Sequence, residues 1–210
     1  MDLWWRLRHL VARETDWSWY PLHRFKFGRD CKVPLAPYAQ RYAAGRSAEA
    51  GRLQLALVEG KGYQEGFFSN PNQRFGKVYA DGDYGFVLET VKPLSVPIAI
   101  ATVTFDIRQI FPEGPTVVVR QLQGIRHRRE YLVGIRWERM LLAVVTDWAR
   151  VHGYAGIACI RGKDSKWAYH CKPGTLYLRY DVSARRNGFR YDETTLLWRL
   201  PLKGVILEEA

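Results

Sequence analysis

The chain has 210 residues, of which 32 are Lys or Arg and 21 are Asp or Glu, so its formal net charge at pH 7 is +11. Hydrophobic residues make up 47% of it and charged residues 25%, a composition that permits a folded core and excludes global disorder. The length fits one large domain, or one domain with an N-terminal extension. The basic charge favours an anionic partner, namely a nucleic acid, a phosphorylated cofactor or an acidic membrane surface; a solvated basic face would look the same.

The N-terminal part gives the weakest structural signals. Residues 2–14 place apolar side chains at helical spacing and predict an amphipathic helix, which docks on its own domain or lies on a membrane surface. Residues 15–36 are rich in Pro and Gly and predict irregular structure. A second helix is predicted over 37–58 and a loop-rich segment over 60–83. We therefore divide the chain into residues 1–83, a helical and loop-rich region packed on the core, and a domain over residues 84–210.

The compartment follows from the cysteines and the apolar runs. Cys31, Cys159 and Cys171 form no C-x-x-C pair, and an odd number argues against a disulfide framework. The N-terminal run is interrupted by charged residues, unlike a secretory signal, and the sequence has no window of about 18 uncharged apolar residues. We expect a cytoplasmic protein.

From Tyr84 onward the pattern predicts an α+β fold with a mixed sheet. Three apolar, β-branched runs (84–91, 97–110 and 116–125) are separated by short turns and predict an antiparallel meander. An arginine-rich loop leads into a helix, RWERMLLAVVTDWARVHGY, which Gly153 is placed to end. A fourth strand, YAGIACIRG, follows a strand–helix unit and should be parallel to the third. A second helix over 174–189 and a last strand over 193–202 complete the domain.

This order of elements over residues 84–201 resembles the GNAT superfamily of N-acyltransferases. Two segments carry the resemblance: the central helix, with paired Leu141 and Leu142 and a WAR segment near its end, and ARRNGFR, a helix that closes with Gly188 and Phe189. The resemblance implies that acetyl-CoA or another acyl-CoA binds where the third and fourth strands part. It also implies direct transfer of the acyl group to an amine within a ternary complex.

The resemblance places the donor at the end of the third strand. Backbone groups there would contact the pantetheine arm, and the following loop and helix N-terminus would hold the pyrophosphate. Unpaired N–H groups and the helix dipole favour an anion at that place, and arginine side chains add charge-assisted hydrogen bonds. The residues that we expect to bind the cofactor are Leu122, Gln123, Gly124, Ile125, Arg126, Arg128, Arg129, Gly134, Arg136 and Arg139.

The loop departs from the family pattern Q/R-x-x-G-x-G/A. With Leu141 and Leu142 as the paired leucines, Arg136 and Glu138 stand where the last two small residues belong; a register shifted to Gly134 stays open. Glu138 suits the helix dipole and would repel a pyrophosphate. If phosphate binds here, arginine side chains must supply much of the contact.

The catalytic candidates are Tyr180 and Glu89. Many family members have a Tyr four residues before the Gly-Phe, which protonates the leaving thiolate; that position is Ala184 here. Tyr180 lies one helical turn earlier and either takes this role or packs in the core. Glu89 and Asp106, on the first two strands of the meander, are candidate general bases, or strand residues that face solvent.

Other chemistries are weaker. His170 and Cys171 are adjacent, so they point to different sides and do not form a nucleophile–base pair. The His and Cys residues lack metal-ligand spacing, and we expect no metal. The run YLRYDVSARRNGFRYD interleaves Tyr with Arg, which suits stacked bases and phosphates, or the solvated side of a helix with Leu178, Val182 and Phe189 inward.

Three hypotheses result. The first is an acyl-CoA-dependent N-acyltransferase with an acidic acceptor, such as a nucleic acid, an acidic peptide or a carrier protein with phosphopantetheine. The second is a catalytically inactive GNAT-like module that binds nucleic acid or an acidic protein, because fold does not imply activity. The third is a peripheral membrane protein anchored by residues 2–14.

Overall fold

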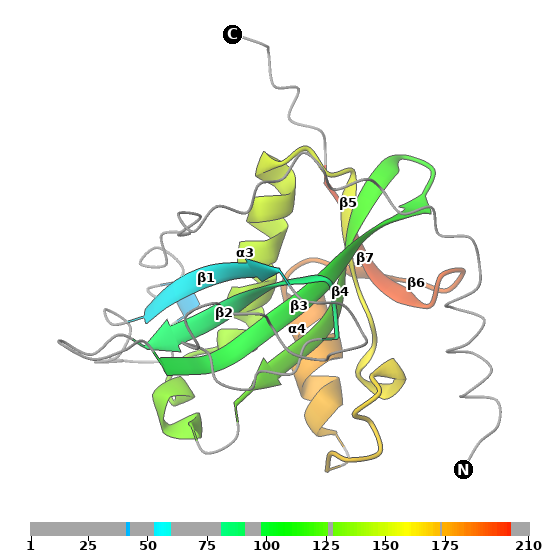
Figure 1. Cartoon of the computed structure of the whole chain (residues 1–210). Coiled ribbons are helices and arrows are strands. Elements are labelled where there is room, and N and C mark those ends of the chain that lie inside the picture. Colours follow the sequence, from blue (N-terminus) through cyan, green and yellow to red (C-terminus); the bar gives the residue numbers. More distant parts are fainter. Residues whose placement is uncertain are drawn as a thin grey trace, which may run out of the picture.

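A computed structural model describes residues 41–42, 53–59, 81–90, 98–125, 128–172 and 174–202 of the chain. They form a seven-stranded mixed sheet in the order β1-β2-β3-β4-β5-β7-β6, and helix α3 lies against one of its faces (Figure 1). The α+β class is as predicted. The strands are β1 (Leu53–Glu59), β2 (Tyr84–Thr90), β3 (Ile98–Phe111), β4 (Gly114–Gly124), β5 (Gly156–Cys159), β6 (Arg190–Asp192) and β7 (Leu197–Pro201).

The predicted meander is confirmed. β2 and β3 are antiparallel, as are β3 and β4, and a tight turn at Pro112 and Glu113 joins the last two. β5 lies parallel to β4, with Thr116 opposite Gly156, because the helix between them returns the chain to the same end of the sheet. The enrichment in β-branched and aromatic residues therefore identified β2, β3 and β4, and the place of β5 after a strand–helix unit identified its direction.

The prediction of helix through residue 58 is wrong for Leu53–Glu59, which forms the edge strand β1. The leucines at positions 53, 55 and 57 have the two-residue period of a strand, and Leu55 is buried opposite Leu88 of β2. The sheet thus begins before the predicted boundary at residue 83. The predicted segments 2–14, 15–36 and 60–80 lie outside the described residues.

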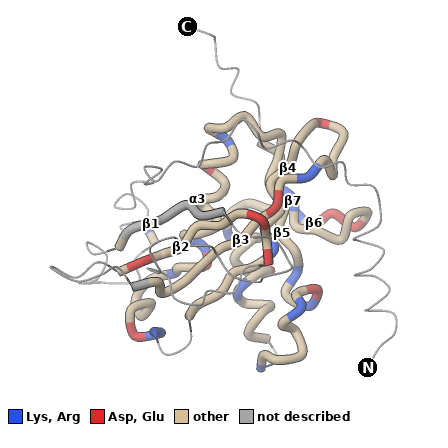
Figure 2. Tube along the Cα trace, in the orientation of Figure 1, with Lys and Arg blue, Asp and Glu red and all other residues tan. Residues whose placement is uncertain are grey.

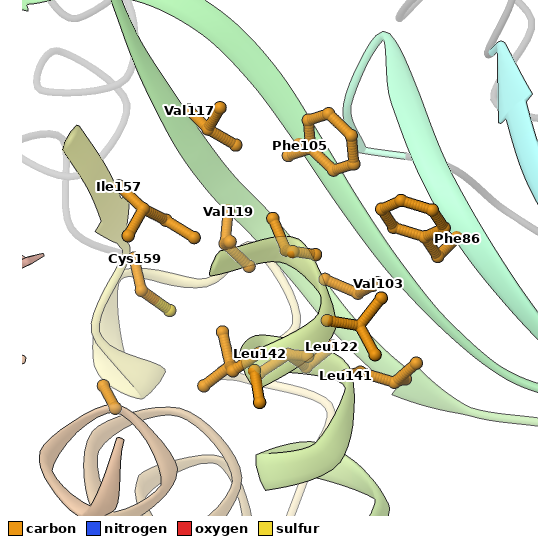
Figure 3. Packing of buried hydrophobic residues seen from close by; sticks show 14 of the residues in the cluster. Phe86, Val103, Phe105, Val117, Val119, Leu122, Leu141, Leu142, Ile157 and Cys159 are labelled. Atoms are coloured by element: carbon orange, nitrogen blue, oxygen red, sulfur yellow. The ribbon is translucent and has the colours of Figure 1, made fainter. Parts of the chain in front are cut away.

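Helix α3 (Trp137–Val151) supplies one wall of the core. Its paired leucines, Leu141 and Leu142, are fully buried against the sheet (Figure 3). Trp148 packs against Phe105 with ring centroids 5.2 Å apart. Gly153 ends the helix with a φ of +71°, a conformation that glycine adopts without strain.

The second helix is less regular than its sequence predicts. Tyr177–Val182 forms a π-helical turn (η4), followed by a short α-helix, α4 (Ser183–Arg186), and Gly188 with a φ of +86° ends it as expected. A π-turn holds more residues than an α-turn and so changes which side chains face inward. Leu178, which one of the two interpretations of this stretch places inward, is 63% exposed, whereas Tyr180 is buried.

The C-terminal strand predicted over 193–202 is confirmed for Leu197–Pro201, which forms β7, whereas residues 193–196 form the turn that joins it to an additional strand, β6. Asp192 accepts hydrogen bonds from the backbone N–H groups of Thr194 and Thr195, and this turn reverses the chain. β7 then inserts between β5 and β6. Among the described residues, no helix is long and apolar enough to cross a membrane.

Candidate functional site

The strands β4 and β5 part halfway along β4. Their pairing covers Thr116–Val119 and Gly156–Cys159, and a bond of 3.2 Å from Ile160 N to the Val119 carbonyl follows it. β4 continues to Gly124 without β5 beside it. Backbone groups on that side of Leu122 therefore need other partners.

The second helix supplies both partners of Leu122. The Leu122 N–H donates to the Tyr180 hydroxyl over 2.9 Å, and the Arg179 guanidinium donates to the Leu122 carbonyl over 3.3 Å. Two residues predicted for different roles, Leu122 for the pantetheine and Tyr180 for proton transfer, are thus in direct contact. Arg179 was missed, because one arginine on an amphipathic helix has no sequence signal of its own.

The Tyr180 hydroxyl lies in a dry environment. Burial raises its pKa, and the hydrogen bond from Leu122, together with Ser165 and the charge of Arg179, only partly offsets the rise. The phenol is therefore protonated at neutral pH. That is the state a proton donor needs.

The N-terminus of α3 already has an anion. The Glu138 carboxylate, in the first turn, accepts a hydrogen bond from its own backbone N–H and lies 4.0 Å from Arg179 Nε. Burial raises the pKa of Glu138, while that N–H and the charge of Arg179 lower it. The N–H of Arg136 donates to the Tyr42 carbonyl over 3.0 Å. Two of the N–H groups at which a pyrophosphate was expected, those of Arg136 and Glu138, thus already have partners within this chain.

The predicted arginines divide into two groups. Arg128 Nη1 donates to the Ala99 carbonyl over 2.5 Å, and the Arg139 guanidinium lies 5.6 Å from the centre of the Tyr42 ring. Arg129 and Arg136 are exposed to solvent. Arg126 lies outside the described residues. An incoming phosphate would therefore meet Arg129 and Arg136 without breaking an existing contact.

The loop itself is not a glycine cradle. It contains a 3-10 helix, η2 (Arg129–Leu132), and Gly134, whose φ of +80° turns the chain into α3. Gly124 is closely packed, since a Cβ there would lie 3.3 Å from the Trp137 ring and 3.3 Å from the Leu132 side chain. The Ile125 N–H donates to the Ile100 carbonyl, and the Gln123 side chain accepts from Gln121. Side chains and helix thus fill the space that glycines leave open in the family pattern.

A buried polar cluster lies on the opposite face of the sheet. Because side chains alternate along a strand, Thr104 and Gln121 point away from the core that Leu122 joins, and they share a hydrogen bond of 3.3 Å. Gln121 also accepts from the Asp81 N–H, and the Asp81 carboxylate contacts Lys166. Burial raises the pKa of Asp81, while Lys166 opposes the rise. The sequence did not predict this cluster, because Asp81, Gln121 and Lys166 come from distant segments of the chain.

The predicted carboxylates are not at the point where the strands part. Glu89 is 2% and Asp106 is 8% exposed, so the alternative that they face solvent is wrong. Strand β3 separates Glu89 from β4, a distance of about 10 Å at the usual strand spacing. Asp106 accepts from the Asp83 N–H and forms an ion pair with Arg108, which gives it a structural role.

The thiols and histidines that the structure describes do not come together in a metal or nucleophile site. Cys159 and Cys171 are free, and burial raises the pKa of Cys159. The His170 ring packs at 6.1 Å from Trp167. Within the described part of the chain, no group of His, Cys, Asp and Glu residues could hold a metal ion.

Known proteins give little further guidance. No protein-family model and no curated protein matches the chain. Among solved structures, a chain of "The crystal structure of KacTA-DNA complex" is similar at 19% identity, with 57% of this chain and 67% of that chain covered and a TM-score of 0.35. A similarity of this extent does not establish a shared fold.

Proposed function

We propose that the chain is a GNAT-like N-acyltransferase that moves an acyl group from acyl-CoA to an amine. One observation carries the proposal: beyond the end of the β4–β5 pairing, the Leu122 N–H is bonded to a buried tyrosine hydroxyl from the following helix. Such a place offers backbone groups to an extended pantetheine arm and a proton donor to its sulfur. We assign this role to the domain over residues 84–210.

Donor binding would exchange internal contacts for contacts with the donor. The amide groups of pantetheine would replace Tyr180 and Arg179 at the Leu122 backbone. Its pyrophosphate would lie at the α3 N-terminus, near the exposed Arg129 and Arg136. Arg179, once released from Leu122, would add a further cation.

The reaction needs one proton donor and one proton acceptor. The amine nitrogen attacks the thioester carbonyl carbon, a C–N bond forms, the C–S bond breaks, and the thiolate takes the Tyr180 proton. The charge of Arg179, which lowers the pKa of Tyr180, would stabilise the phenolate that results. The amine proton passes to a base; Glu89 stays our candidate and would act through bridging water over more than about 10 Å, because its partner on β3, Ala99, lies four positions from Val103, the partner of Leu122.

A second function is favoured by the internal contacts themselves. Tyr180, Arg179 and Glu138 already satisfy the groups that a donor would use. A catalytically inactive GNAT-like module, which binds nucleic acid or an acidic protein, would keep these contacts permanently. The two functions differ in whether CoA binds.

Thermal melting with CoA separates them. A ligand present at 100 times its Kd stabilises the folded state by about 2.7 kcal/mol, which raises the Tm of a chain of this size by roughly 5–10 °C. Arg136→Ala should reduce this rise, whereas Arg150→Ala, at the far end of α3, should not. An unchanged Tm at millimolar CoA contradicts the acyltransferase and leaves the inactive module.

A further inference from the structure

More than half of the net charge lies in one segment of the chain. Residues 161–190 contain eight Lys or Arg and two Asp, a formal charge of +6 out of +11 (blue and red in Figure 2). The segment runs from the loop after β5 through the π-turn η4 and α4 to Arg190, the first residue of β6. This concentration is independent of the proposed donor site, which uses only Arg179 and Tyr180 from it.

Both carboxylates of the segment are used internally. Asp164 accepts from Arg161 Nε over 2.6 Å. Asp181 is buried and accepts from the Gly162 N–H and from Trp198 Nε1, each over 2.9 Å. Five cations of the segment are exposed, and none forms an ion pair with a carboxylate in the described part of the chain: Lys163, Lys172, Arg185, Arg186 and Arg190.

Aromatic side chains lie among these cations. Tyr169 is 67% and Tyr177 is 51% exposed, which is unusual for residues of this size. The Tyr177 hydroxyl accepts from Arg185 Nη2 over 2.7 Å, so one exposed ring is joined to one exposed guanidinium. Leu178, beside it, is also exposed.

The loop between Gly162 and Leu176 is closed on itself. A Cβ on Gly162 would lie 2.5 Å from the Leu176 carbonyl carbon, so the two ends of the loop are in backbone contact. Lys163, which follows Gly162, therefore lies close to Tyr177, which follows Leu176 at the start of η4. We use the name basic-aromatic face for the exposed cations and tyrosines of residues 161–190, namely Lys163, Tyr169, Lys172, Tyr177, Arg185, Arg186 and Arg190.

We propose that the basic-aromatic face binds a single-stranded nucleic acid. Its cations would contact phosphates, while Tyr177 and Tyr169 would stack on bases. Paired bases inside a duplex offer no free ring face, and the carboxylates of an acidic peptide offer no aromatic ring on which the tyrosines could stack. A single strand therefore uses both properties of the face.

Fluorescence anisotropy with the full chain and labelled 12-mers of oligo(dT) and oligo(U) tests this proposal. With five phosphate contacts, log K should fall against log salt with a slope of about −3.5, since each contact to a single strand contributes about −0.7. Arg185→Gln combined with Arg186→Gln should bring the slope to about −2. Tyr177→Leu should weaken binding about tenfold and leave the slope unchanged.

The control removes the same charge elsewhere. Arg120→Gln combined with Arg150→Gln lies outside the basic-aromatic face and should change the affinity by less than threefold. Tighter binding of either oligonucleotide to wild type than to the Arg185/Arg186 variant supports the proposal. The ratio of the affinities for oligo(dT) and oligo(U) shows whether the protein prefers DNA or RNA. A control as weak as the face variant, a Tyr177→Leu variant that binds normally, or polyglutamate that competes as well as an oligonucleotide would each overturn the proposal.

Discussion

Glu138→Gln is the substitution that most directly tests the donor site. The wild-type carboxylate lies at the N-terminus of α3, where the pyrophosphate of a donor would bind, and it accepts the backbone N–H of its own residue. Gln keeps the size of the side chain and removes the charge. We expect CoA to bind the variant more tightly.

The size of the effect follows from Coulomb's law. Two unit charges 5 Å apart interact by about 3 kcal/mol at an effective dielectric constant of 20. The Glu138 side chain is 26% exposed, so water screens part of this repulsion. A gain of about 1.4 kcal/mol, or tenfold in Kd, is a conservative expectation.

Calorimetric titration with CoA and with pantetheine is the assay. CoA carries the pyrophosphate and pantetheine does not, so Glu138→Gln should tighten CoA alone. Glu130→Gln, an exposed carboxylate in the same loop, is the matched control and should leave both affinities unchanged. If Glu138→Gln leaves the affinity for CoA unchanged, or tightens pantetheine equally, the pyrophosphate does not bind at α3 and the reasoning is refuted.

Three more predictions concern stability. The pKa of Glu138 is raised in the folded state, so its protonation contributes stability that is present below the unfolded pKa near 4.5 and is lost as pH rises through the folded pKa. The difference in unfolding free energy between wild type and Glu138→Gln should therefore change with pH between these two pKa values. A difference that stays constant with pH in urea melts contradicts the raised pKa. Tyr180→Phe removes the acceptor of the buried Leu122 N–H and should cost about 1–3 kcal/mol in urea melts, whereas Tyr177→Phe, at an exposed ring, should cost under 1 kcal/mol. Leu141→Ala should cost about 2–5 kcal/mol, and the exposed Leu178→Ala should not; similar Tm values for the two would contradict the packing of α3.

The sequence predicted the elements whose composition or periodicity is strong. The runs 84–91, 97–110 and 116–125 are rich in β-branched and aromatic residues and are bounded by turns, which identifies β2, β3 and β4, and the apolar stripe of α3 is equally clear. β1 was missed because an alanine-rich stretch before it favours helix, while pairing with β2 decides the outcome. The β6–β7 hairpin was missed because its turn depends on a single side chain, Asp192.

The candidate site was predicted only in part, and for a physical reason. Leu122 and Tyr180 were both named, yet their contact spans 58 positions and no local pattern records it. The polar cluster of Asp81, Gln121 and Lys166 likewise joins three distant segments. Tertiary contacts of this kind depend on how the strands part, and strand pairing is not encoded by periodicity.

The departures of the loop from the family pattern form a connected set. Placing a carboxylate at position 138 puts a negative charge at the helix N-terminus, and Arg179 lies close enough to lower the pKa of that group. The same guanidinium reaches the Leu122 carbonyl and lies 5.4 Å from the centre of the Trp137 ring. A change at Glu138 therefore alters the balance of contacts at Arg179, and through Arg179 the accessibility of the Leu122 backbone. Because these groups share one cation, donor affinity should respond non-additively to Glu138→Gln and Arg179→Gln, and a double-mutant cycle measures that coupling.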